Sequence, residues 1–129
     1  MATIHRTIDV EAAPGAVWEK VSNTEGISDL IGFLASSEQT GNVRRCALDN
    51  GGSLTERIVS VDPTMKRVLY SITDSPLNME FHAASMQVEE NGGGSRLVWT
   101  IDLLPAEAVD HLAPMIDAAC TDMKTSLAS

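Results

Sequence analysis

The chain has 129 residues, enough for one domain with a hydrophobic core of its own. Aromatic residues make up only 4%, so aliphatic and methionine side chains must supply most of that core. Nine lysines and arginines against eighteen aspartates and glutamates give a formal charge of −9. This charge argues against nucleic acid and anionic membrane surfaces as partners, because both bind basic proteins, but it leaves open an anionic ligand inside a pocket.

The sequence favours a cytoplasmic protein without a metal or cofactor. Cys46 and Cys120 lie in no Cys/His cluster, and we expect two reduced, buried thiols. The N-terminus has charges and no apolar run, unlike a signal peptide, and no stretch approaches the ~20 apolar residues of a membrane helix. There is no zinc-site spacing, phosphate-binding glycine loop or Gly-x-Ser-x-Gly elbow.

The chain is expected to begin with a strand and two short helices. Thr3–Glu11 alternates apolar and polar residues, as a half-buried strand does. Pro14 suits the first position of a helix, whose apolar face is Val17, Trp18 and Val21. Asn23–Phe33 has apolar residues at helical spacing and predicts a second short helix, which its two glycines weaken.

Strands and turns alternate from Leu34 to Leu103. Tight turns join neighbouring strands antiparallel, so these segments predict a meander. The strands named by the pattern are Val43–Leu48, Leu54–Val61, Arg67–Thr73, Met79–Glu89 and Arg96–Leu103.

The last segment changes to helical spacing. We expect a helix over about Pro105 to Ser126, in which Leu112, Ile116, Cys120 and Met123 face the sheet. Pro114 is expected to kink or interrupt it.

This order of elements resembles the helix-grip fold of the START-like (SRPBCC) superfamily, and most closely its polyketide cyclase/dehydrase branch. The resemblance covers nearly the whole chain and is carried by an ordered set of segments: Ile8–Pro14 with Val17-Trp18, Gly41–Arg44, Gly51–Glu56, Val68–Ile72, Ser75–Leu77 and Ser95–Trp99. It implies a single α+β domain over residues 1–129. In that fold a curved antiparallel sheet of six or seven strands wraps around a long C-terminal helix. The resemblance also implies an internal cavity for a small, largely apolar, polyketide- or lipid-like molecule.

The turns between strands allow an estimate of which residues share a face. If Leu48 opposes Leu54, then Arg44 opposes Ile58 and Cys46 opposes Glu56. If Ser60 opposes Val68 across the next turn, then Ile58 opposes Tyr70 and Glu56 opposes Ile72. The side chains of these residues lie on one face of the sheet, and because most of them are apolar, this face is expected to be the inner one.

Arg44, Glu56 and Tyr70 are thus expected as polar groups on an apolar wall, with the two charges paired. Met86 and Val88 place His82 on the same face. These four residues are the candidate catalytic groups. The candidate ligand-binding residues are Leu54, Ile58, Ile72, Trp99, Ile116 and Cys120.

Three functions remain open. In an enzyme that cyclises or dehydrates a polyketide-like substrate, Arg44 would hold an oxyanion or carbonyl, Glu56 would act as base or orienting group, and Tyr70 or His82 would donate a proton. In a carrier or sensor the same cluster would only orient the ligand. In an interaction protein the cavity would be largely filled. Arg44 and Glu56 also fit a purely structural ion pair, Tyr70 and Trp99 fit plain core aromatics, and a homodimer is left open.

Overall fold

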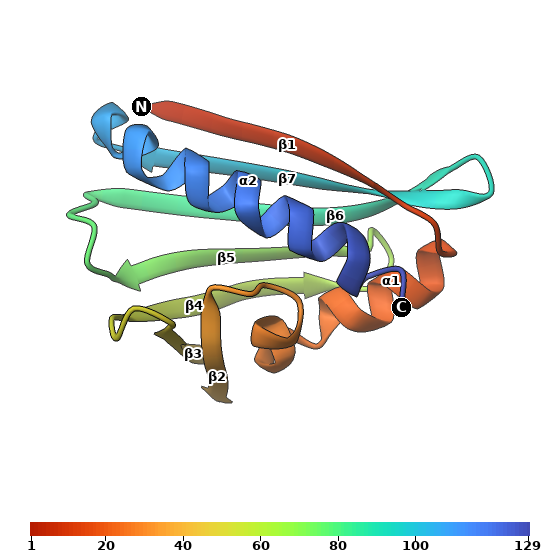
Figure 1. Ribbon diagram of the computed structural model, residues 1–129, viewed down its shortest axis with the longest axis horizontal. Helices are drawn as coiled ribbons and strands as arrows, with labels where there is room; N and C mark the ends of the chain where they lie inside the picture. Colours follow the sequence, from red (N-terminus) through yellow and green to blue (C-terminus); the bar gives the residue numbers. More distant parts are fainter.

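Seven antiparallel strands form one curved sheet in the computed structural model, which describes residues 1–129 (Figure 1). Their order across the sheet is β1-β7-β6-β5-β4-β3-β2. The strands are β1 Ala2–Val10, β2 Leu34–Thr40, β3 Val43–Leu48, β4 Ser53–Asp62, β5 Arg67–Asp74, β6 Phe81–Asn91 and β7 Gly94–Leu104. The N-terminal strand β1 pairs with the last strand, β7, so residues far apart in the sequence are neighbours at this edge of the sheet.

One long helix lies across the inner face of this sheet. Helix α2, Val109–Ser126, follows a single 3-10 turn, η2, at Ala106–Ala108 and runs beside β1 (Figure 1). Helix α1, Pro14–Ser22, and the 3-10 helix η1, Thr24–Asp29, follow β1 and lie at one end of the sheet. The predicted helix-grip fold is therefore confirmed. No helix combines the length and the apolar character that a membrane crossing requires.

Both helical segments differ in detail from the prediction. The second short helix ends at Asp29 instead of Phe33, and the backbone at Gly26 within it departs from helical geometry. Pro114 does not interrupt α2. It is exposed in the second turn, where its missing N–H removes one intrahelical hydrogen bond.

The face of α2 that packs on the sheet is shifted slightly from the predicted one. Leu112, Ile116 and Met123 are buried as expected, but Ala119 is the fully buried residue of the next turn and Cys120 is only half-buried. The helical period of 3.6 explains the exchange, since position 119 lies closer than 120 to the line through 112, 116 and 123. Both cysteines are free thiols, and only Cys46 is buried.

The predicted strand register was wrong by two residues at the β3–β4 hairpin. Arg44 opposes Glu56 directly, and Cys46 opposes Leu54. The turn is shorter than expected, because the Leu48 N–H donates to the carbonyl of Gly52 at 2.8 Å and Gly51 adopts φ +93°, which glycine favours. A shift of two residues keeps every side chain on its face.

In the β4–β5 hairpin the predicted pairs Ile58–Tyr70 and Glu56–Ile72 are confirmed. A bulge between Ile58 and Ser60 places Ser60 opposite Leu69 instead of Val68. This bulge and a second irregularity, between Thr55 and Glu56, lie on either side of the two confirmed pairs, so the cluster keeps its alignment.

Candidate functional site

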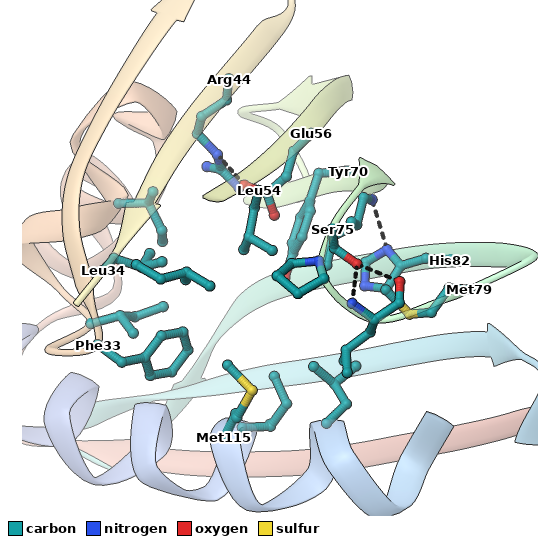
Figure 2. A pocket seen from close by; sticks show the side chains of 18 of the residues that line it. Phe33, Leu34, Arg44, Leu54, Glu56, Tyr70, Ser75, Met79, His82 and Met115 are labelled. Atoms are coloured by element: carbon teal, nitrogen blue, oxygen red, sulfur yellow. Dashed lines mark hydrogen bonds and ion pairs between the residues drawn. The ribbon is translucent and has the colours of Figure 1, made fainter. Parts of the chain in front are cut away.

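A cavity of about 190 Å³ lies between the inner face of the sheet and α2 (Figure 2). Fifteen of its 21 lining residues are hydrophobic, so a ligand inside it would be covered mainly by apolar surface. Arg44 and Glu56 lie at one end of this space, and Phe33 and Met115 lie on the opposite side (Figure 2).

Most of the predicted site residues line this cavity. They are Arg44, Leu54, Glu56, Tyr70, Ile72, His82, Trp99 and Ile116. Two others do not line it: Ile58 is buried in the core beside Tyr70, and Cys120 is on the flank of α2 near Asp117 and Arg6. The strand parity placed Ile58 on the correct face, but parity carries no information on how deep the cavity extends along a strand.

Arg44 and Glu56 form a buried ion pair. The Arg44 Nε donates to Glu56 Oε1 at 2.8 Å, and its Nη1 donates to the carbonyl oxygen of Thr24, in η1, at 2.8 Å. Only 3% of Arg44 and 5% of Glu56 are exposed. The Cys46 thiol lies 3.6 Å from the same Glu56 oxygen, and burial raises the pKa of this thiol to about 12, so it stays protonated and donates. The Glu56 carboxylate thus accepts from both Arg44 and Cys46, and the Arg44 guanidinium donates to both Glu56 and Thr24.

Tyr70 is neutral and has a fixed orientation. The Trp99 Nε1–H donates to its hydroxyl oxygen at 3.1 Å, and the Arg44 guanidinium carbon lies 5.2 Å from the centre of its ring. Burial raises the pKa of the Tyr70 phenol well above its ordinary value. Since Trp99 occupies one side of the oxygen as a donor, the phenol proton remains available to a ligand.

His82 occupies a gap in the sheet. The β5–β6 ladder ends at the pair Tyr70–Ala84, and beyond it the backbone N–H of Ile72 donates to His82 Nδ1 at 2.9 Å. Burial lowers the pKa of His82 to about 4, so at neutral pH the ring is uncharged and carries its proton on Nε2. The ring centre lies 5.8 Å from that of Tyr70.

The part of the cavity mouth formed by the loop between β5 and β6 was not predicted. The loop between β5 and β6 contributes Ser75, Pro76, Leu77 and Met79, and Phe33 and Met115 complete an apolar rim (Figure 2). The Ser75 hydroxyl accepts from the Leu77 N–H and donates to the Leu77 carbonyl, which folds the loop on itself. An irregular loop has no periodicity from which its inward residues can be deduced. The one sequence signal for it was the Ser75–Leu77 segment of the family pattern.

These side chains together form a row of hydrogen-bonding groups along one wall. Arg44, Tyr70 and His82 supply donors, and Glu56 is the only carboxylate that lines the cavity. No group of three or more histidine, cysteine, aspartate or glutamate side chains is placed to hold a metal ion. The row is suited to bind one polar end of a molecule whose remainder is apolar.

Comparison with known proteins agrees with this architecture. The solved structures that resemble it include XoxI from Bacillus cereus (TM-score 0.91, 20% identity, covering 98% of this chain and 96% of that chain) and the Zhui aromatase/cyclase from Streptomyces sp. R1128 (TM-score 0.79, 18% identity, covering 98% and 90%). Ara h 8.0201 shares the same fold (TM-score 0.77, 16% identity, covering 98% and 97%). No curated protein matches the sequence. The sequence does match, over residues 1–129, the model of the family described as polyketide cyclase/dehydrase and lipid transport, and the chain therefore belongs to that family.

Proposed function

We propose that this protein binds a small, largely apolar molecule between its sheet and α2. The observation that carries the proposal is the row of Arg44, Glu56, Tyr70 and His82, from four successive strands, along one wall of a mostly apolar cavity. The polar end of the ligand lies against this row, and the apolar remainder lies toward α2. The family, whose description includes lipid transport, supports the same reading. A role with a filled cavity is less well supported, because about 190 Å³ is left open.

Replacing Leu54 by Trp tests this site. Leu54 lines the cavity from β4, so an indole there occupies the space that the ligand needs. Propylbenzene, titrated into the protein and followed by NMR shifts of the backbone amides, is expected to bind at least about tenfold more weakly to L54W than to the wild type, a loss of about 1.4 kcal/mol.

The matched control is Val59→Trp, on the same strand but 54% exposed. It adds the same side chain outside the cavity and is expected to leave propylbenzene affinity unchanged. Equal binding by the wild type and L54W, or a wild type that binds neither propylbenzene nor para-propylphenol, which adds a polar end to the same ring, would contradict the proposal.

Catalysis is a second candidate function, favoured by Glu56 being the single carboxylate beside three donors. In a dehydration, Glu56 accepts the proton next to the substrate carbonyl, and Arg44 or Tyr70 stabilises the developing oxyanion. The protonated Glu56 then gives this proton to the departing hydroxyl, which leaves as water and restores the carboxylate. His82, neutral at physiological pH, donates a hydrogen bond here instead of acting as a charged acid.

The β-hydroxyketone formed from benzaldehyde and acetone is a suitable probe, because its dehydration gives a conjugated enone that absorbs in the ultraviolet. If the protein is a dehydratase, Glu56→Gln is expected to lower kcat by about 100-fold or more, with a much smaller change in KM. A wild type that does not accelerate enone formation would leave the chain a carrier for this class of compound.

A further inference from the structure

The net charge of the cavity lining is set by a single ion pair. Among its lining residues only Arg44 and Glu56 carry a charge, and these two are joined at 2.8 Å. A second guanidinium nitrogen of Arg44 is already engaged by the Thr24 carbonyl. The positive charge of Arg44 is therefore neutralised within the protein before any ligand enters.

No other group in the cavity offers a second charge at neutral pH. His82 is held neutral by burial, and its Nδ1 accepts the backbone N–H of Ile72. Tyr70 keeps its phenol proton. The polar groups Asn50 and Ser75, which also line the cavity, are uncharged amide and hydroxyl groups. What remains for a ligand is a set of neutral hydrogen-bonding groups beside a satisfied ion pair.

A carboxylate ligand would be unfavourable in this environment. It would place a second anion near Glu56 with no free cation to balance it, and a buried charge without a partner is costly. The protein's formal charge of −9 adds long-range repulsion. A carbonyl or hydroxyl of the same size loses far less hydration and accepts a hydrogen bond from Tyr70 or His82.

The volume of the cavity limits the size of the ligand. A cavity of about 150 Å³ lined by aliphatic side chains is known to accommodate benzene, and pockets for drug-sized ligands begin at about 300 Å³. The cavity of about 190 Å³ therefore fits one ring with a short substituent. A molecule of several fused rings would have to displace α2 or the loop that carries Leu77 and Met79.

We propose that this cavity selects an uncharged ligand of about one substituted ring, whose polar end is a hydroxyl or a carbonyl, and rejects the carboxylate of the same shape. The inference rests on the proposed binding function and narrows its ligand class.

A matched series of probes tests the selection in the wild-type protein. Calorimetry at pH 7 with para-propylphenol and para-propylbenzoate compares a neutral and an anionic head on the same ring and chain. The phenol is expected to bind at least about tenfold more tightly, and phenanthrol at least about tenfold more weakly than para-propylphenol. Equal affinity for the phenol and the benzoate would overturn the charge selection, and equal affinity for phenanthrol would overturn the size limit.

The Glu56→Gln variant tests whether the Arg44–Glu56 ion pair causes the preference for the uncharged ligand. Removing the carboxylate leaves the Arg44 charge without its partner, so the ratio of benzoate to phenol affinity is expected to rise by at least about tenfold. The matched control is Glu107→Gln, which changes the net charge equally at an exposed position on η2 and is expected to leave the ratio unchanged. An unchanged ratio in folded E56Q would overturn the assignment of selectivity to the ion pair.

The outcomes separate this inference from the function on which it rests. If neither propylbenzene nor para-propylphenol binds the wild type, the binding function fails and the selectivity fails with it. If both bind and the benzoate binds equally well, the binding function stands and the selectivity is wrong. Should E56Q not fold, the wild-type ratios of the three probes still decide the proposal.

Discussion

Replacing Arg44 by Met is expected to lower the free energy of unfolding by about 3–5 kcal/mol, the range for removing one partner of a buried ion pair. The variant leaves Glu56, only 5% exposed, without its cation, and leaves the Thr24 carbonyl without its donor. The Cys46 thiol, 3.6 Å away, is a weak donor and cannot replace a guanidinium. Urea unfolding followed by circular dichroism gives the measurement.

The double variant Arg44→Met with Glu56→Leu shows how much of the lost stability comes from the unpaired charge and how much from lost packing. With both charges removed, the wall becomes apolar, and we expect the double variant to be more stable than R44M by about 2 kcal/mol. The control is Arg96→Met, which breaks the exposed pair with Asp9, whose side chains are 38% and 58% exposed, and which should cost no more than about 1 kcal/mol. A double variant no more stable than R44M would show that the pair is needed for packing and not only for charge balance.

The sequence was sufficient to place the polar cluster because a register error of two residues leaves each side chain on the same face of the sheet. The β3–β4 turn proved two residues shorter than assumed, and an even shift leaves Arg44 and Glu56 on the inner face. The irregularities after Thr55 and after Ile58 leave Glu56 opposite Ile72 and Ile58 opposite Tyr70. Arg44 and Glu56, predicted as diagonal neighbours, are in fact directly opposite, which brings their side chains closer together than expected.

The extent of the cavity was not predictable in the same way. Its size depends on how closely α2 approaches the sheet, and this distance depends on packing at single positions such as the fully buried Ala119. Its mouth is formed by a non-repetitive loop, including Leu77 and Met79. The tautomer of His82 depends on a hydrogen bond from the Ile72 N–H to Nδ1, which lies just beyond the last pair of the β5–β6 ladder.

The stability of the protein is expected to fall by about 3 kcal/mol between pH 7 and pH 4 through His82 alone. Burial lowers the pKa of His82 in the folded protein from 6.5 to about 4, so the unfolded chain binds a proton on this ring first. The stabilisation is complete above about pH 6.5 and is lost as the pH falls through about 4. Urea unfolding of the wild type across this range, compared with His82→Asn, isolates the contribution.

Asparagine is the matched replacement because its side-chain oxygen takes the place of Nδ1 as acceptor for the Ile72 N–H, yet it does not titrate. Carboxylates that titrate in the same range are present in both proteins, so their effects cancel in the difference between the two stability curves. Nitrogen-15 NMR of the imidazole provides the direct check: we expect a neutral ring protonated on Nε2 at pH 7 and a midpoint near pH 4. A midpoint near 6.5, or stability curves for the wild type and H82N that stay parallel down to pH 4, would show that water reaches the ring and that the cavity wall around His82 is more open than its burial indicates.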